Sequence, residues 1–524
     1  MISRLASMLI FALVAGALAV MPARAADPTV LTYATYAEFV QLDPATNNST
    51  TTARAIRAAY EGLVRYRGDT SEIEPVLASS WSISRDRKMY TFKLRPGVTF
   101  HDGTPMNAQA VVFSFERLLK LNKGPAALYT DKVEGIKAAD DMTVVFTLKK
   151  PWTPFLASLA VSKGPFIVSP TAVKANEKNG DFGQDYLKAQ MVGTGPYKLE
   201  SWDKGGALVL VKHDKYWRGW SGRHVDRVVY QYVKEYSTRR QLLLKGDADI
   251  IDAPSPEDLP NLRQDAKVRA VSSPTLNLEY IVLNMRQKAL ADRRVREAIN
   301  LAFDRESAVK GVMSGEVIDT VGYLATGFTS AHYAVPPTKR NVERAKELIR
   351  AAVKDKGLNN DDLTLTYLYW SGEDRLRQLG EVLKASLAEA GVTVQMKELG
   401  WSAYTATILN PDQVPAMPFY GAWLTYADPS AALRPYFHSK STFNLGGYVN
   451  PQIDAILEEA ETLDDPGKRA TMYKEVQKLA AADMPWIPLW GMKVTTPMRS
   501  WVKGYVFNPI YMSENNFYDV YVDR

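Results

Sequence analysis

A strand–helix–strand pattern in the second half of the chain constrains the fold most. Leu363 to Tyr369 has the composition of a strand, and Val392 to Leu399 has that of a second one. Between them, Glu373 to Ala390 has helical periodicity and ends before Gly391. Strands joined by such a crossover helix run parallel. An open parallel sheet binds ligands outside the carboxyl ends of its strands, so the loops that follow these strands are candidate ligand contacts.

The same alternation continues along the chain and predicts an α/β protein. The further predicted strands are Val30 to Thr35, Met89 to Arg95, Thr143 to Lys149, Ala207 to Lys212 and Met417 to Leu424. The further predicted helices are Arg294 to Val309, Asn341 to Ala352, Pro451 to Leu463 and Pro466 to Ala482, the last with Asp465 as its N-cap. We find no internal repeat and no low-complexity linker.

The N-terminus predicts export. Arg4 precedes an apolar run from Leu5 to Met21, and Ala23-Arg24-Ala25 fits the small-residue pattern of a signal-peptide cleavage site. Residues 1–25 are therefore predicted to be a signal peptide, with the mature chain starting at Ala26 in the periplasm. The alternative is an uncleaved signal anchor. Because the chain has no cysteine, it has neither a disulfide nor a cysteine for lipid attachment.

Length and charge narrow the class of protein further. The chain has 524 residues, which is too long for one hydrophobic core and predicts two or three domains. Its formal charge of +6 falls to +4 once Arg4 and Arg24 are removed, and no basic stretch stands out. Nucleic acid is therefore not an expected partner. With 46% apolar residues the chain is expected to be globular.

His101 and Asp102 raise the question of catalysis, because a His–Asp pair can serve as a catalytic dyad or as half of a metal site. They lie in a turn with Gly103, and Asn107 then caps a predicted helix. An Asp before Gly commonly bonds nearby backbone N–H groups in a turn. No histidine or cysteine stands at ligand spacing from His101. We therefore interpret the pair as scaffolding, and expect no catalytic residue, metal site or cofactor.

The segment around this turn resembles a known family. The stretch WSISRDRKMYTFKLRPGVTFHDGTPMNAQAVVFSFERL is similar to the signature of the family 5 extracellular solute-binding proteins, the dipeptide, oligopeptide and nickel receptors of bacterial ABC importers. Further motifs follow in family order: Gly193-Thr194-Gly195-Pro196-Tyr197 before Trp202, Gly246-Asp247-Ala248-Asp249, Leu283-Asn284-Met285, DRRVREAINLAFDR, and Pro485-Trp486-Ile487-Pro488-Leu489. The resemblance covers essentially the whole mature chain.

The resemblance implies a two-lobed, class II periplasmic binding-protein fold with the ligand in the cleft between the lobes. Lobe I would comprise residues 26–75, 193–285 and 495–524, with residues 76–192 as an inserted subdomain; lobe II would comprise residues 286–494. Two strands would cross between the lobes, near Ile281–Asn284 and Ile487–Lys493. The expected partners are a small solute or peptide and an inner-membrane ABC permease with its ATPase subunits, and the receptor is expected to act as a monomer.

Three loops are predicted to line the cleft. The first follows the predicted strand that ends at Thr35, the second follows the one that ends at Tyr369, and the third lies at the end of the one predicted for Met417 to Leu424. Their candidate ligand contacts are Tyr36, Glu38, Phe39, Trp370, Trp423, Tyr426 and Asp428. Family receptors for free peptides hold the ammonium with an Asp a few residues beyond the tryptophan that Trp423 matches. Leu424, Thr425 and Tyr426 follow here instead. In dipeptide receptors an Arg in the first loop holds the carboxylate, but this chain has no arginine there before Arg375.

Several alternatives stay open at this point. Asp428 either contacts the ligand or caps a helix that begins at Pro429. Ser371 and Asp374 resemble a capping box. The ligand itself is a peptide, an opine-like conjugate, an oligosaccharide or a metal chelate. An exported hydrolase and a ligand sensor or chaperone not coupled to transport are the other classes of protein, although the chain has no G-x-S-x-G, H-E-x-x-H or Walker A motif.

Overall fold

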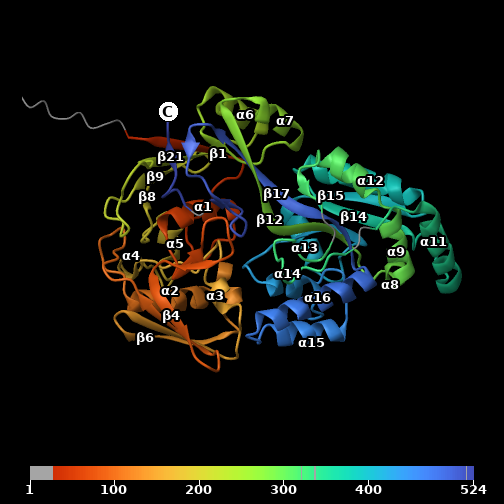
Figure 1. The fold of residues 1–524 in the computed structure, drawn as a ribbon, viewed down its shortest axis with the longest axis horizontal. Helices are drawn as coiled ribbons and strands as arrows, with labels where there is room; N and C mark the ends of the chain where they lie inside the picture. Colours follow the sequence, from red (N-terminus) through yellow and green to blue (C-terminus); the bar gives the residue numbers. More distant parts are fainter. Residues whose placement is uncertain (1–27, 320–321, 336–337, 515) are drawn as a thin grey trace, which may run out of the picture.

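Two long strands connect the two bodies of the molecule. In the computed structural model the described residues are 28–319, 322–335, 338–514 and 516–524, so the predicted signal peptide lies outside them. Strands β12 (Val268–Val282) and β17 (Trp486–Arg499) cross from the left body to the right body in Figure 1. They pair antiparallel almost end to end, from Val268 with Arg499 to Val282 with Trp486. They belong to an 11-stranded sheet that runs through both bodies.

The first body, lobe I, holds one end of this sheet. The strand order from β17 is β11 (Ile250–Ile251), β1 (Val30–Thr35), β10 (Arg227–Tyr232), β9 (Ala207–Lys212) and β8 (Tyr197–Trp202). The predicted strands at Val30 to Thr35 and Ala207 to Lys212 are confirmed. The helices that accompany it are α1 (Thr50–Ala59), α6 (Tyr236–Lys245) and α7 (Leu259–Gln264).

The second body, lobe II, holds the other end of the sheet. Here the order from β12 is β16 (Met417–Ala422), β14 (Thr364–Trp370) and β15 (Thr393–Leu399), while β13 (Val317–Ile318) pairs with β17. Strands β14 and β15 are parallel and are joined through α12 (Asp374–Ala388), which confirms the predicted strand–helix–strand unit. Strand β16 is parallel to β14 and antiparallel to β12.

One predicted helix of lobe II is wrong. The segment Arg294 to Val309 is not continuous: α9 (Arg293–Ala302) ends, Phe303 is extended, and α10 (Arg305–Ser307) leads into a wide π-helical turn, η3 (Ala308–Val312). The Asp304 carboxylate accepts the Ser307 N–H, so a local N-cap competes with the continuing helix. The other lobe II helices are α8 (Lys288–Ala291), α11 (Val342–Lys356), α13 (Trp401–Ile408), α14 (Pro429–Phe437), α15 (Pro451–Ala460) and α16 (Pro466–Asp483).

A separate four-stranded antiparallel sheet lies low in the left body of Figure 1, in the order β4 (Ala78–Ile83), β5 (Met89–Leu94), β7 (Thr143–Leu148) and β6 (Val133–Asp140). Helix α2 (Ala108–Leu121), capped by Asn107 as predicted, packs Phe115 against Phe146 of this sheet. The predicted division of the chain into lobe segments stays a prediction.

The remaining elements are β2 (Val64–Tyr66), β3 (Ile73–Pro75), η1 (Gly124–Leu128), α3 (Phe155–Ser158), α4 (Pro170–Ala175), α5 (Gln184–Leu187), η2 (Pro256–Asp258), β18 (Val502–Lys503), β19 (Phe507–Asn508), β20 (Ser513–Glu514) and β21 (Tyr521–Val522).

No helix within the described ranges is long and apolar enough to cross a membrane.

The glycines of the Gly193-Thr194-Gly195 motif allow a turn to pack directly on the end of α1. A Cβ on Gly193 would lie 2.2 Å from the Ala59 carbonyl oxygen, and one on Gly195 would lie 2.6 Å from that of Ala58. Both contacts are with backbone, which cannot rotate away as a side chain can. The motif is therefore a packing requirement of the fold rather than a phosphate-binding loop.

Gly193→Ala should lower the free energy of unfolding by about 3 kcal/mol, because the added methyl group overlaps a carbonyl oxygen. Gly135→Ala is the matched control, since its Cβ would meet no atom within 4 Å, and we expect a change within about 0.5 kcal/mol. Urea unfolding of both variants checks this. Equal stability of the two variants would contradict the packing explanation.

Candidate functional site

The direction of β12 fixes which edge of the lobe II sheet faces lobe I. β12 enters lobe II with its C-terminal half, and Leu278 pairs with Ala422 while Ile281 pairs with Phe419. Because β16 is antiparallel to β12, the carboxyl end of β16 points back toward lobe I. β14 and β15 run parallel to β16, so their carboxyl ends point the same way.

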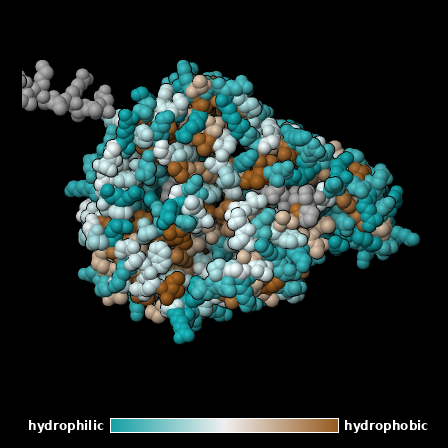
Figure 2. Space-filling model, viewed as in Figure 1, coloured by the Kyte–Doolittle hydropathy of each residue, from teal (hydrophilic) through white to brown (hydrophobic). Residues whose placement is uncertain are grey.

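The same reasoning holds for lobe I. β17 returns from lobe II and pairs antiparallel with β11, so the carboxyl end of β11 points toward lobe II. β1 is parallel to both β11 and β10. The two sheets therefore direct the carboxyl ends of their parallel strands toward each other. Such opposed edges are where an open α/β sheet places its ligand, and Figure 2 shows apolar patches near the middle of this face, within a mostly hydrophilic surface.

Three tryptophans follow the ends of three neighbouring strands in lobe II. Trp370 is the last residue of β14, Trp423 directly follows β16, and Trp401 follows β15 after one glycine. Trp370 is largely buried and packs edge-on against Trp401 at 5.3 Å between ring centroids. Trp423 and Trp401 remain 39% and 58% exposed. The sequence analysis missed Trp401, although its place just after a strand of the same parallel sheet was the available signal.

Arg375 lies beside these tryptophans but is already paired. Its guanidinium donates to both carboxylate oxygens of Glu279 at 2.9 and 3.0 Å, and its Nε donates to Glu373 at 2.8 Å. The Glu279 carboxylate raises the pKa of Arg375 despite burial. Trp490 of β17 also donates to Glu279 at 2.8 Å. The cluster thus ties both crossing strands to the first turn of α12, and its two carboxylates outnumber its one guanidinium.

The predicted capping box at Ser371 and Asp374 is wrong. Helix α12 begins at Asp374 with Glu373 at the cap position, and no side chain caps it. The Ser371 N–H donates instead to the Leu399 carbonyl of β15. Glu373 accepts the Trp370 indole N–H at 3.1 Å, which orients that ring. Gly372 has a φ of +97°, and this turn displaces the helix start by two residues.

The lobe I edge is formed around Tyr36 and Asp252. Tyr36 is 49% exposed, and burial, Asp252 and the more distant Glu373 of lobe II raise its pKa. Asp252 follows β11, accepts the Tyr36 N–H at 2.9 Å and pairs with Arg54 at 2.9 Å. The sequence analysis missed Asp252 and Arg54, because their partners are far away in the chain.

The two other candidates of lobe I differ in their exposure. Phe39 is 3% exposed and packs edge-on against Tyr230 in the lobe I core. Glu38 is exposed, and its carboxylate is near Gly205 in the turn between β8 and β9. Their contact with a ligand stays a prediction, as does that of Tyr36.

Asp428 is committed to protein partners. Its side chain accepts the Ser430 N–H at 2.9 Å at the start of α14, so the structure contains the helix cap that the sequence offered as an alternative. It also pairs with Arg469 of α16 at 2.7 Å, with side chains only 9% and 11% exposed. Tyr426 is buried, and its ring meets Trp152 of lobe I edge-on at 6.0 Å.

His101 and Asp102 take scaffolding positions. The His101 Nε2 lies 3.0 Å from the Gly195 carbonyl oxygen, and Asp102 accepts the Thr104 N–H at 3.0 Å. Burial lowers the pKa of His101 to about 4, and the neighbouring His213 adds to this effect. The two imidazole rings are 5.0 Å apart. No group of three or more His, Asp or Glu within the described ranges is arranged to hold a metal ion.

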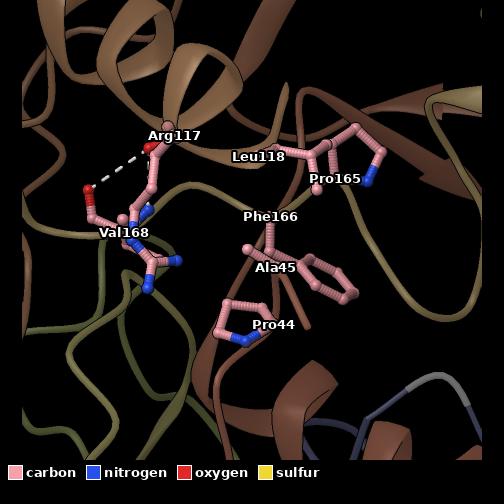
Figure 3. Close-up of a pocket in the computed structure, with 8 residues that line it drawn as sticks. Pro44, Ala45, Arg117, Leu118, Pro165, Phe166 and Val168 are labelled. Carbon is pink, nitrogen blue, oxygen red and sulfur yellow. Dashed lines mark hydrogen bonds between the residues drawn. The ribbon is translucent and has the colours of Figure 1, made fainter. Parts of the chain in front are cut away.

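A small cavity lies inside lobe I, away from the opposed edges. Figure 3 shows Arg117, Leu118, Pro165 and Phe166 around it. Its volume of about 10 Å³ suits roughly one water molecule. Arg117 is held there by a bidentate pair with Asp43 at 2.9 and 2.6 Å. The cavity is too small for a solute.

Opposed sheet edges, two crossing strands and exposed tryptophans define a two-lobed binding protein that holds a solute between its lobes. Residues 72–444 match the family model described as bacterial extracellular solute-binding proteins, family 5. The chain belongs to this family. The resemblance seen in the sequence is thereby confirmed, and the family consists of binding proteins rather than enzymes.

Individual relatives agree with this assignment. A probable D,D-dipeptide-binding periplasmic protein, DdpA, of Escherichia coli K12 is 31% identical, over 90% of each chain. Heme-binding protein A of Haemophilus influenzae is 30% identical, over 88% of this chain and 87% of its own. The solved structure of the ABC transporter-associated periplasmic binding protein DppA from Helicobacter pylori with the peptide STSA has a TM-score of 0.80 at 28% identity, and the match covers 95% of this chain and 99% of that one. The protein is thus a periplasmic substrate-binding receptor of an ABC importer.

His101→Gln should make stability less dependent on pH. The folded pKa of about 4 lies below the usual value of 6.5, so the unfolded chain takes up a proton first as the pH falls. Stability is therefore lost between pH 6.5 and 4, by up to about 3 kcal/mol from this one group. Urea unfolding of the variant and the wild type at pH 7 and pH 4.5 measures it. A variant with an unchanged pH dependence would show that His101 does not titrate in this way.

Asp428→Asn should lower the free energy of unfolding by about 3 kcal/mol, because it leaves the Arg469 guanidinium without a carboxylate partner in a largely buried position. Asparagine is an equally good helix cap, so loss of the ion pair dominates. Asp374→Asn is the matched control, since its Arg377 partner is 49% exposed, and a change of about 0.5 kcal/mol or less is expected. If Asp428→Asn were as stable as the control, the carboxylate would not have a structural role.

Proposed function

We propose that this receptor binds a small peptide-like solute that lacks a free ammonium group at the Trp423 loop, and delivers it to an inner-membrane ABC permease. The observation that carries the proposal is the state of Asp428. It is the only carboxylate of the loop from Trp423 to Asp428, and Arg469 and the Ser430 N–H already occupy it. A buried ammonium without a carboxylate partner is unfavourable by several kcal/mol.

The carboxylate of a free peptide also lacks an available cationic partner in the loop after β14. Arg375, the first arginine after β14, lies in the first turn of α12 and is bonded to both Glu279 and Glu373. A ligand carboxylate would have to displace one of them. The exposed rings of Trp423, Trp401 and Tyr36 instead suit a ligand held by stacking and apolar burial. An N-acylated peptide whose carboxyl group is also amidated or otherwise conjugated meets both conditions.

Export and assembly complete the proposal. The family of periplasmic receptors supports cleavage after Ala25, which would release the mature chain into the periplasm. One chain builds both opposed edges, which supports action as a monomer. The relatives that bind dipeptides and glutathione support a solute with amide bonds.

The test compares a free dipeptide such as Ala-Tyr with its N-acetyl form amidated at the carboxyl end, in thermal unfolding and calorimetry. At about 100 times its dissociation constant a ligand stabilises a protein by roughly 2.7 kcal/mol. We expect this stabilisation from the N-acetyl form and little or none from the free dipeptide. Trp423→Ala should abolish it, because the stacking surface is lost.

Trp81→Ala, in the four-stranded sheet of lobe I, is the matched control and should keep the ligand response. Full stabilisation by the free dipeptide, lost in Asp428→Asn, would make Asp428 an ammonium ligand and contradict the proposal. Stabilisation by neither form would also count against an acylated dipeptide as the ligand class.

A further inference from the structure

Lys163 is a half-buried cation of lobe I that has no anionic partner in the protein. It is the only charged residue between Lys150 and Lys174. Among the residues that the structure describes, no carboxylate or carbonyl oxygen bonds its ammonium group. Burial lowers the pKa of Lys163, and no neighbouring charge offsets this effect. The side chain is therefore available to an anion from outside the protein.

Three buried arginines near the site are in a different state, because each pairs with a carboxylate: Arg54 with Asp252, Arg375 with Glu279, and Arg469 with Asp428. A cation withdrawn from water without such a partner is unfavourable. An anionic group that reaches Lys163 removes this cost, and it displaces no protein carboxylate in doing so.

The residue before Lys163 is anchored at the lobe I edge of the site. The Ser162 carbonyl accepts a hydrogen bond from Nη1 of Arg57, on α1, at 3.2 Å. One turn earlier on α1, Arg54 forms the ion pair that adjoins Tyr36. Lys163 thus follows a residue that is bonded to the helix beside this edge.

The same segment meets lobe II at the loop that carries Trp423. The Tyr66 hydroxyl donates to the Ala157 carbonyl at 2.9 Å and accepts the Ala427 N–H at 2.8 Å. In Figure 1 helix α3, which contains Ala157, lies on the side of the left body that faces the right body. Residues 157–163 of lobe I therefore lie opposite residues 423–428 of lobe II.

A second route joins the anchor of this segment to the same lobe II loop. Arg57 also donates to the Ser513 hydroxyl, and the neighbouring Met512 sulfur accepts from the Asn277 side-chain amide of β12. The Asn277 carbonyl oxygen in turn accepts the Leu424 N–H at 2.7 Å. Two independent chains of hydrogen bonds thus place the lysine segment across from this loop.

We propose that Lys163 binds a carboxylate at the outer end of the acyl group of the solute. This rests on the proposed function, in which the blocked amino end of the peptide lies at the Trp423 loop, opposite Lys163. The contact is a charge-assisted hydrogen bond, which is stronger than the bond to a neutral group of the same shape. The solute class is thereby narrowed to peptides acylated with a dicarboxylic acid.

Calorimetry with three derivatives of Ala-Tyr amide tests the contact. They carry an N-succinyl group, an N-succinamoyl group with a neutral amide in place of the outer carboxylate, or an N-acetyl group. The protein is unfolded and refolded beforehand to remove co-purified solute. We expect the succinyl form to bind at least about tenfold more tightly than the succinamoyl form, as for a hydrogen bond between charged groups.

Lys163→Met should abolish this preference, because it removes the cation and keeps a side chain of similar length. Lys163→Arg should keep a preference for the succinyl form. Lys137→Met is the matched control, since Lys137 is exposed in β6, and it should bind like the wild type. Lys163→Met should resist urea at least as well as the wild type, because an unpaired half-buried charge is lost. A loss of preference is then not a loss of folding.

NMR of isotopically labelled, reductively methylated lysines reports on Lys163 itself. Its signal is the one that Lys163→Met lacks. The pKa of Lys163 should rise when the succinyl form binds, because a nearby carboxylate favours the charged ammonium. The succinamoyl form should leave this pKa unchanged.

Equal affinity for the succinyl and succinamoyl forms would overturn the proposal, as would a preference that Lys163→Met retains. The proposed function fails separately, when the neutral N-acetyl form does not bind. If none of the three forms binds, titration of the Lys163 signal with succinate alone decides. A rise in the pKa of Lys163 with succinate supports the carboxylate contact, and an unchanged pKa contradicts it.

Discussion

The pairing of β12 with β17 is the constraint on which the rest of the structure depends. These two strands are the backbone of both lobe sheets, and their directions determine the directions of β11 and β16 beside them. Because β1 and β10 run parallel to β11, and β14 and β15 run parallel to β16, the carboxyl ends of the parallel strands in the two lobes face one another. The register shift between Pro274 and Leu278 interrupts regular pairing midway along the two strands. The binding site is thus a consequence of two strand directions.

Charge pairing around the crossing strands shapes what the site accepts. Glu279 lies on β12 and is 2% exposed, yet it is fully satisfied by Arg375 and Trp490. Breaking such a pair would leave an uncompensated buried charge, so Arg375 is held firmly on Glu279. Arg375 in turn fixes the first turn of α12 and, through Glu373, the ring of Trp370. Asp252 and Arg54 have the same role in lobe I, next to Tyr36. The polar groups near the site thus mainly bond to other protein groups, and on this ground the proposed function assigns the ligand to the aromatic rings.

The sequence alone predicted the elements whose signal is local. Periodicity located β14, α12 and β15 within one or two residues. The Asp-Pro step pointed to the cap of α14, and Asn107 to that of α2. It could not reveal partners distant in the chain, such as Arg469 for Asp428 or Trp152 for Tyr426. Two local patterns were misleading. The predicted helix is interrupted at Phe303, where Asp304 caps a new turn, and the predicted capping box at Ser371 is absent because Gly372 has a positive φ. The crossing strands are longer than their motifs, because residues 268–274 of β12 continue the pairing with residues 493–499 of β17.

The central claim is that the ligand lies between the opposed carboxyl edges of the two sheets. A crystal structure of the receptor purified with its natural solute tests this most directly. The account predicts a solute in contact with Tyr36 of lobe I and Trp423 of lobe II at once. A solute that touches only one lobe would contradict it.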